Sequence, residues 1–524
     1  MLTTLLIVCL CPSATVRPDG LDSHAIAAAI DRASPGDTVR LATGTYVLTE
    51  PVRPTSGLKV LGAGPGKTRL VYVGRKRAVL VQVQDCHDVE IGEMTLDGNS
   101  DPLIGQGIAG SNARRLWIHH VTIRDLVPSP KTFGPHGILL SGVNPTMRRG
   151  VTDSRISDCL IENIGVGAKF GGGVRLNWGC VRNVIERLVI RKTGRGGIFG
   201  DHSAELVIRK NRVSGSGGTG LGIEIWGGCP RSVIEDNVID HWLSVDNSPV
   251  SAVRRNVIGT DDGTVKGYGI EVIARDVVVT DNVVTRGAHI GLSLSNKPVK
   301  NNVYWGYNRV RDCIQWGAQF QGETGGIARQ YFYRCVFEKT VRGDSHARYP
   351  RDSGHGFRTN GACRELVFEQ CTVRDNGGLG FQFGGKGIEA IALLRCTISG
   401  NALAAISPPS PPGVLQIAGC TVRGNGSDRL PAPRRRPGAG PVADFDGPKT
   451  IRAGQPVTFR CTSKPGAAKI VERLWDFNHG IPATAEAPSH TFAKAGNYRA
   501  TLIVWDAAGR GARAEKTLTV LPAK

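Results

Sequence analysis

The sequence predicts an all-β protein in which a parallel β-helix is followed by a smaller β-sandwich. The chain has 524 residues, more than one compact core usually holds. Its 69 glycines and its scarcity of aromatic residues favour many short strands joined by turns. A four-residue β segment, such as "NVID" or "CTVR", recurs between residues 93 and 423, and most neighbouring copies start 24 to 28 residues apart. A repeat of this length is typical of a β-helix in which each repeat forms one coil.

The recurring segment begins with Asn in the middle of the repeat array and with Cys near its end, and we call it the Asn/Cys segment. Parallel pairing at about 4.8 Å would place like residues above one another in successive coils. The asparagines are therefore expected to form an amide ladder: Asn211, Asn237, Asn256, Asn282 and Asn308. The cysteines at this position are expected to be small buried packing residues, not disulfides: Cys335, Cys371, Cys396 and Cys420.

A second segment follows in nearly every repeat and has the pattern Gly, apolar, variable, apolar, variable. Examples of this Gly segment are "GIEIW" (222–226), "GIEVI" (269–273) and "GFRTN" (356–360). Because side chains alternate along a strand, the variable positions should point outward and the apolar positions into the coil. "WLSVD" (242–246) matches less well, and its register could slip by one residue. Stacked coils would thus build a surface from two columns of outward residues.

The stretch 23–48 differs from the repeats. "AIAAAIDRA" (25–33) predicts a short amphipathic helix, which Pro35-Gly36 ends before an alternating strand. A helix here would cover the exposed end of the stack and prevent edge pairing. The stretch, and "SPGDTVRLATGTY" in particular, resembles the opening of pectate-lyase-like right-handed β-helix proteins. This resemblance covers residues 20–427 and implies a right-handed parallel β-helix, but no particular activity.

Residues 428–440 are rich in Pro, Gly and Arg, which predicts a linker, and residues 441–524 have a different character. Their antiparallel-style strands indicate an Ig-like β-sandwich. "WDF" (475–477), followed by "HTF" and "LIVWD", resembles a PKD domain, although the usual "GDG" of that family is replaced by "NHG" (478–480). The resemblance implies an accessory domain that binds carbohydrate or protein and does not catalyse.

Residues 1–19 are expected to be a signal peptide with the mature N-terminus, because "MLTTLLIVCLCPSA" is a short apolar run that ends in small residues. An incorrectly chosen start codon is the alternative. We see no other apolar run that could span a membrane, so we expect a secreted or cell-surface protein, and a monomer. The net charge of +20 favours a polyanionic partner, while the scattered Lys and Arg residues argue against nucleic acid.

The outward columns are expected to place four carboxylates within about four rungs, or roughly 15 Å: Asp201, Glu224, Asp246 and Glu271. Neighbouring carboxylates raise one another's pKa unless a cation or a base pairs with them. Such a cluster suits acid–base catalysis on a sugar, or a Ca²⁺ site with oxygen ligands. The four residues are therefore candidates both for catalysis and for binding Ca²⁺, and the other catalytic candidates are Arg175, Arg358 and His355.

Polar and aromatic residues of the same face are candidates for substrate binding. Trp226 could stack on a sugar ring, and a surface aromatic packed under a loop is the alternative. The other candidates for substrate binding are Asn177, Gln319, Gln321, Asn360 and His136.

Three long insertions enter the Gly segments and lie next to this face. The insertions at 126–137 and 339–356 bring His136 and His355 to the start of a strand, and the insertion at 259–269 carries Asp261-Asp262. Loops on a rigid scaffold often carry function. Taken one at a time, the histidines could equally be strand caps and the Asp pair a turn.

These features predict a polysaccharide-active protein, and two enzyme mechanisms stay open. In a lyase, an Arg, Lys or His would remove a proton from a uronate whose charge is neutralised by Ca²⁺ or Arg. In a glycoside hydrolase, two of the four carboxylates would act as acid and base. The substrate is expected to be an acidic polysaccharide, and no organic cofactor is expected. The alternative is a non-catalytic adhesin or glycan-binding surface protein, because a fold does not by itself imply a function.

Overall fold

A computed structural model describes residues 13–129, 134–144, 146, 149–217, 221–259, 267–286, 288–294, 302–343, 353–385, 388–407, 413–434 and 438–524, without the side chains of 322–325. The chain divides into two compact units, which are described separately. The N-terminal unit comprises Met1–Val184 and Lys192–Gly194, and the C-terminal unit comprises Ile185–Arg191 and Arg195–Lys524.

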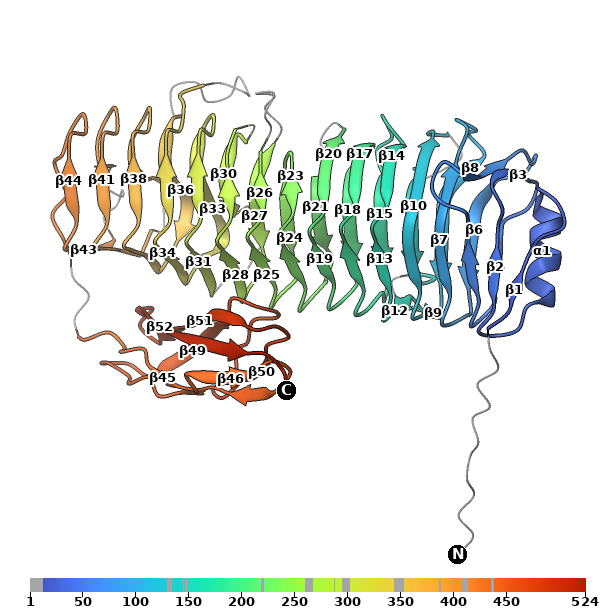
Figure 1. The fold of residues 1–524 in the computed structure, drawn as a ribbon. Helices are drawn as coiled ribbons and strands as arrows, with labels where there is room; N and C mark the ends of the chain where they lie inside the picture. The colour runs from blue at the N-terminus through green and yellow to red at the C-terminus, as the bar shows by residue number, and fades with distance from the viewer. Residues whose placement is uncertain are drawn as a thin grey trace, which may run out of the picture. The chain divides into compact units, whose positions relative to one another are not determined.

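The described residues of the N-terminal unit include one helix, α1 (Ser23–Arg32), which is followed by stacked strands (Figure 1). The side chain of Asp22 caps α1 by accepting a hydrogen bond from the backbone N–H of Ala25 at 2.8 Å. The apolar side of α1 is buried, and the helix contacts β1 (Thr15–Val16) and β3 (Gly44–Leu48). The predicted helix is therefore confirmed at the start of the stack.

The other strands of the N-terminal unit pair mostly in parallel. Their bounds are β2 (Thr38–Arg40), β4 (Lys59–Leu61), β5 (Thr68–Tyr72), β6 (Ala78–Gln84), β7 (Glu90–Asp97), β8 (Ile104–Ser111), β9 (Ala113–Arg114), β10 (Trp117–Leu126), β11 (His136–Ser141), β12 (Val151–Thr152), β13 (Arg155–Ser157), β14 (Leu160–Ile164) and β15 (Gly172–Asn177). Two further strands span the sequence boundary between the units, β16 (Val184–Glu186) and β17 (Val189–Thr193).

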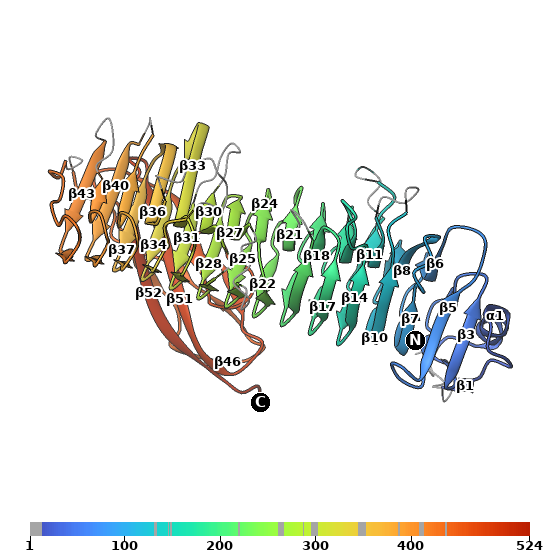
Figure 2. The same ribbon diagram turned by 90° about the horizontal axis from the view of Figure 1, so that it is seen from above.

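In the C-terminal unit each coil contributes a short strand to three parallel ladders (Figure 2). The Gly-segment ladder consists of β18 (Gly196–Asp201), β21 (Leu221–Trp226), β24 (Leu243–Asp246), β27 (Tyr268–Ile273), β30 (Ile290–Leu294), β33 (Trp316–Ile327), β36 (His355–Cys363), β39 (Phe381–Phe383) and β42 (Ile406–Ser407). The middle ladder consists of β19 (Val207–Arg209), β22 (Val233–Glu235), β25 (Ala252–Arg254), β28 (Val277–Thr280), β31 (Val303–Gly306), β34 (Gln330–Tyr333), β37 (Leu366–Glu369), β40 (Ala390–Leu394) and β43 (Val414–Ala418). The Asn/Cys-segment ladder consists of β20 (Arg212–Ser216), β23 (Val238–Ile239), β26 (Val257–Ile258), β29 (Val283–Val284), β32 (Arg309–Arg311), β35 (Val336–Glu338), β38 (Thr372–Arg374), β41 (Thr397–Ser399) and β44 (Thr421–Arg423).

The Gly segments pair in the register that the sequence predicts. Ile223, Leu243 and Ile270 lie opposite one another on successive strands, so "WLSVD" does not slip. The repeated glycine is required by close packing, because a Cβ at Gly269 would lie 2.4 Å from the carbonyl oxygen of Gly291 in the next coil. The apolar positions of these strands are buried, which places the core inside the coils.

The expected amide ladder is confirmed. From Asn211 to Asn308, each Nδ2 donates to the Oδ1 of the asparagine one coil further on, at 2.9–3.0 Å. The residue before each asparagine turns the chain sharply through a left-handed conformation, as Asp236 does with φ of 58°. A second amide ladder, which we did not predict, links Asn376, Asn401 and Asn425 at 2.8 and 2.7 Å.

Aromatic rings and thiols fill the coils near the C-terminal end of the repeats. The rings of Trp305, Phe332 and Phe368 stack almost in parallel, with centroids 5.7 and 4.6 Å apart. The eleven cysteines of the described residues form no disulfide, and the four of the Asn/Cys segment are buried except Cys420, which is partly exposed. The predicted packing role of these thiols is therefore confirmed.

The C-terminal strands form the predicted Ig-like sandwich. They are β45 (Phe445–Asp446), β46 (Thr450–Arg452), β47 (Pro456–Thr458), β48 (Arg460–Cys461), β49 (Ile470–Asp476), β50 (Ser489–Thr491), β51 (Gly496–Asp506) and β52 (Gly511–Leu521). Four of them form a sheet in the order β46-β52-β51-β49. Trp475, Phe477 and Phe492 lie at the centre of its core. The domain therefore has a hydrophobic core of its own.

Within the part of the chain that is described, no helix has both the length and the apolar character needed to cross a membrane. Residues 1–12, which hold most of the expected signal peptide, lie outside the described residues, as do Asp261 and Asp262.

Candidate active site

The strands of the Gly-segment ladder stack along the C-terminal unit (Figure 2), and their outward positions align in a column. Glu224 on β21 lies opposite Ser244 on β24, which lies opposite Glu271 on β27. At about 4.8 Å per rung, the backbones of the two glutamates are roughly 10 Å apart. The column continues through Ser293, Gln319 and Arg358. The predicted alignment of these side chains is confirmed.

The four carboxylates of this face are buried, although they occupy the outward positions of their strands. Asp201, Glu224, Asp246 and Glu271 are each only 5–6% exposed. Side chains on adjacent rungs are close enough to cover one another, and larger side chains from the strand starts also contact them. The site is therefore a largely desolvated acidic cluster.

Burial changes the acidity of Glu224. Desolvation is the largest cause and raises the pKa of its carboxyl group to about 7. The positive charge of Arg195, whose Nη2 lies 3.5 Å from Oε2 of Glu224, opposes this shift, whereas the negative charges of Asp246 and Glu271 add to it. At neutral pH, Glu224 is thus present in both its protonated and its ionised form, as a general acid requires.

Glu271 is held by two donors from the preceding coil. Ser244 Oγ donates to its Oε2 at 3.0 Å, and the indole Nε1 of Trp242 donates to the same oxygen at 3.2 Å. Tyr268 packs edge-on against Trp242, with ring centroids 4.7 Å apart. Glu271 is therefore fixed in position two rungs from Glu224.

Asp201 and Trp226 form a second pair, because they lie opposite one another on β18 and β21. The imidazole Nδ1 of His202 is 2.5 Å from Oδ1 of Asp201, and the same ring meets Trp226 edge-on at 6.1 Å. Trp226 is 40% exposed, so a large part of its indole faces solvent beside the buried carboxylates. This arrangement suits the predicted stacking on a sugar ring.

Further along the ladder, the predicted residues are more dispersed. Arg358 stacks on the ring of Trp316 at 4.6 Å, and Gln321 lies opposite Asn360 on the neighbouring strand. His355 is buried, and its Nδ1 accepts a hydrogen bond from the backbone N–H of Leu379 at 2.9 Å. One nitrogen of His355 is therefore engaged in a structural contact.

Three predicted residues belong to the N-terminal unit. Arg175 Nε donates to Oδ1 of Asn177 at 2.8 Å. His136 is buried, and desolvation, aided by the charge of Arg175, lowers its pKa to about 3. His136 is therefore neutral at physiological pH and is not placed on an open surface.

The side chains predicted to bind Ca²⁺ make other polar contacts in this structure. No group of three or more His, Cys, Asp or Glu residues in the described ranges is placed to hold a metal ion. Glu224 instead faces Arg195, and Glu271 faces Trp242 and Ser244. Ca²⁺ binding by these carboxylates therefore stays a prediction, and no step below depends on a metal.

Three neighbours of the carboxylates were not predicted: Arg195, His202 and Trp242. Arg195 and Trp242 each stand directly before a Gly-segment strand, and His202 directly follows one. All three therefore lie outside the alternating positions from which the outward columns were predicted. Polar or aromatic residues at strand ends were the signal that could have identified them.

Two family models match the chain. The model of the right-handed β-helix region matches residues 76–327, and the model of the PKD domain matches residues 438–520. Together with the parallel coils and the C-terminal sandwich, they define the class: the chain is a right-handed parallel β-helix protein with a C-terminal PKD domain.

Three known proteins illustrate this similarity. Alginate lyase 7 of Azotobacter vinelandii is 29% identical over 182 residues, covering 30% of this chain and 21% of the lyase. Collagenase ColQ1 of Bacillus cereus is 35% identical over 81 residues, covering 15% of this chain and 8% of the collagenase. The chain thus spans about a fifth or less of these relatives. The A-module of the mannuronan C-5 epimerase AlgE6 of Azotobacter vinelandii is 16% identical, with 78% of this chain and 96% of the module covered and a TM-score of 0.40.

Proposed function

We propose that the chain is an exported enzyme that cleaves glycosidic bonds in an acidic polysaccharide, with Glu224 as its general acid. The observation that carries the proposal is the raised pKa of Glu224, about 7, in a buried cluster with two further carboxylates. Environments that push the pKa values of neighbouring acids apart are typical of acid–base catalysis.

The chemical step that Glu224 would perform is protonation of the leaving oxygen. As the C–O bond of the glycosidic link breaks, protonated Glu224 would transfer its proton to that oxygen and become a carboxylate. Arg195, 3.5 Å away, would then stabilise the new negative charge. In hydrolysis, Glu271 would activate the attacking water, because a backbone separation of roughly 10 Å leaves room for substrate and water between the two side chains.

A lyase reaction would use the same proton donor but a different partner. There, a base would remove a proton next to the uronate carboxylate while Glu224 protonates the leaving oxygen. Arg358 lies five rungs, or roughly 24 Å, from Glu224, so on this face it would hold the charge of another uronate of the same polysaccharide and not that of the reacting one. The similarity to a protein named alginate lyase 7, and the net charge of +20, support an acidic substrate for either reaction.

A panel of uronate and neutral polysaccharides tests the proposal. The full chain is incubated with each, with and without chelator, while ultraviolet absorbance of unsaturated sugars and the number of reducing ends are followed. A lyase produces both signals, and a hydrolase produces reducing ends alone. Binding to a polysaccharide without either signal on any substrate would contradict the enzyme proposal.

The pH dependence of kcat/KM follows from the same residue. Because the protonated form of Glu224 is the active form, we expect activity to fall by about tenfold per pH unit above pH 7. The measurement is the pH profile of kcat/KM on the substrate that the panel identifies. A profile that stays flat from pH 6 to pH 9 would show that Glu224 is not the acid.

A second candidate function is glycan binding without catalysis, and the exposed indole of Trp226 is the observation that favours it. The two functions predict different results for Trp226→Ala. In a binding protein the variant loses affinity for the polysaccharide, whereas in the enzyme it raises KM while activity at saturation persists.

A further inference from the structure

The outer side of the middle ladder carries an apolar face. Five side chains on this side are each at most 4% exposed: Val278, Tyr304, Tyr331, Tyr333 and Val367. They do not point into the coils, because the core there is filled by the side chains that alternate with them, such as Trp305 and Phe332. Something outside the coils must therefore cover them.

The cover is provided by the PKD domain. Leu474 on β49, and Ile503 and Trp505 on β51, pack in one hydrophobic cluster with the five coil residues. The rings of Tyr331 and Trp505 meet edge-on with centroids 6.1 Å apart. The strands of the domain are thus apolar on both sides, since the alternate residues fill its own core. A free domain with this outer side would expose a contiguous apolar patch.

Polar contacts surround this apolar cluster. Arg499 pairs with Asp281 at 2.5 Å, and the hydroxyl group of Tyr307 donates to Glu515 at 2.8 Å. The guanidinium of Arg513 lies 3.2 Å from the ring centroid of Tyr333. An apolar centre with polar contacts around it is the usual composition of a specific interface.

Arg254, at the end of β25, is the most deeply buried charge in this interface. Its side chain is fully buried, and Nη2 and Nε donate to Oδ1 of Asp476 at 2.6 and 3.1 Å. Nη1 donates to the carbonyl oxygen of Gly480 at 2.5 Å. A buried guanidinium needs such partners, so without the PKD domain Arg254 would lose the carboxylate that neutralises it.

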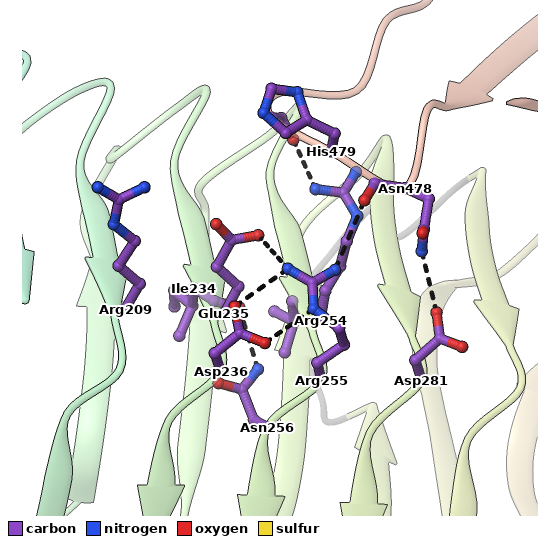
Figure 3. A network of polar contacts seen from close by, with 12 residues as sticks. Arg209, Ile234, Glu235, Asp236, Arg254, Arg255, Asn256, Asp281, Asn478 and His479 are labelled. Atoms are coloured by element: carbon purple, nitrogen blue, oxygen red, sulfur yellow. Dashed lines mark hydrogen bonds and ion pairs between the residues drawn. The ribbon is translucent and has the colours of Figure 1, made fainter. Parts of the chain in front are cut away.

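The loop 478–480, where the sequence has "NHG", also contacts the coils (Figure 3). Asn478 Nδ2 donates to Oδ2 of Asp281 at 3.2 Å, and its carbonyl oxygen accepts from Arg255 at 3.5 Å. Asn478 has φ of 54°, a conformation in which glycine is more favourable. The side chain at 478 therefore contributes a contact with the coils that glycine could not make.

We propose that the PKD domain is a fixed structural part of this protein, and that its binding partner is the tyrosine-rich face of the middle ladder in the same chain. The polar contacts of Arg254 and of the loop 478–480 hold the domain on this face. Its β49–β51–β52 face is consequently not available to a glycan or to another protein. Any external ligand of the domain would have to use other surfaces.

Cleavage of the linker tests this proposal on the complete protein. A site for a specific protease is inserted between residues 428 and 433, which are outside regular strands, and the cut protein is analysed by size-exclusion chromatography. We expect the two fragments to elute together at micromolar concentration. The cut complex is then labelled with a fluorophore at its C-terminus and diluted, and its fluorescence anisotropy gives the Kd.

Two variants and one matched control test the polar contacts of Arg254 and Asn478. Arg254→Met, which leaves Asp476 buried without its partner, is expected to raise Kd at least roughly 30-fold. Asn478→Gly is expected to raise Kd about threefold to tenfold, because it removes one side-chain contact but suits the positive φ of that position. Arg231→Met removes a half-exposed pair with Glu205 at 3.7 Å, away from this interface, and should leave Kd unchanged.

Near-UV circular dichroism shows whether each variant keeps its tertiary structure. If Arg254→Met does not fold, Asn478→Gly still tests the interface, because glycine suits the backbone conformation at 478 and this variant should therefore fold. Separation of the wild-type fragments at micromolar concentration, or a Kd for folded Asn478→Gly equal to that of the wild type, would overturn the proposal.

Discussion

Glu224→Gln is expected to lower kcat roughly 10²- to 10⁴-fold on the polysaccharide substrate, the usual contribution of a general acid. The amide has nearly the same shape as the protonated carboxyl group but has no proton to transfer. Because the substitution keeps the packing beside Arg195, KM should change far less than kcat. The measurement is steady-state kinetics of the variant and the wild type at pH 6 and pH 8.

The same substitution should stabilise the fold at alkaline pH. In the unfolded chain the pKa of Glu224 is near its ordinary value of 4.5, and in the folded chain it is about 7. Between these values the folded state holds a proton that the unfolded state releases, so the raised pKa costs stability as pH rises through this window. Above pH 7 the cost is complete and amounts to about 3 kcal/mol. Glutamine removes it, so the variant should have the higher Tm at pH 8.5 and an equal Tm at pH 4.

Together, the two measurements separate a catalytic role from a structural one. A merely structural glutamate would lose stability on substitution, and activity would fall only as far as folding does. Glu205→Gln is the matched control, because Glu205 lies in the same unit with a half-exposed partner, Arg231, and should change neither activity nor Tm. Full activity of Glu224→Gln would remove this residue from the mechanism.

The repeat explains why so much of the fold could be predicted from the sequence. Each coil meets the same neighbours, so the requirements at Gly269 recur at Gly291, and those at Asn237 recur at Asn256. A local pattern therefore carried long-range information about register. The second amide ladder also follows the repeat, but its asparagines, such as Asn401, stand five residues after the cysteine that begins the Asn/Cys segment and therefore outside that segment.

The site was predicted less well, because burial and charge depend on side chains that the repeat does not specify. The column of Glu224 and Glu271 followed from alternation, whereas their burial depends in part on Arg195 and Trp242 outside the strands. The contact between Asp476 and Arg254 joins residues 222 positions apart in different domains. No periodic signal links such residues, although the apolar residues on both sides of β51 could have indicated a covered face.

The second large effect is expected for Asn256→Ala in the middle of the amide ladder. Asn256 is fully buried, and its Oδ1 accepts from both the side chain and the backbone N–H of Asn237, at 2.9 and 3.0 Å. Its Nδ2 donates to the carbonyl oxygen of Ile234 and to Asn282. Alanine takes one hydrogen bond from each of these buried groups, although the side chains of Asn237 and Asn282 each keep a second one. At about 1–3 kcal/mol for each buried group that is left without a partner, a loss of about 4 kcal/mol is expected.

Urea unfolding followed by tryptophan fluorescence measures this loss, with Asn425→Ala as the matched control. Asn425 is the last asparagine of the second ladder and is only partly buried, so its removal should cost about 1 kcal/mol. A loss below about 1 kcal/mol for Asn256→Ala would contradict the assigned role of the ladder, since that is the size of a single replaceable hydrogen bond.

The double variant Asn256→Ala/Asn282→Ala then tests whether the ladder acts as a unit. The bond from Asn256 Nδ2 to Asn282 Oδ1 is lost in each single variant, and in each case a buried group of the remaining asparagine loses one of its two hydrogen bonds. In the double variant both partners are gone, so this part of the cost disappears. The double variant should therefore lose about 1–2 kcal/mol less stability than the sum of the two single variants. Strict additivity would mean that each asparagine stabilises only its own turn and that the ladder carries no coupling between coils.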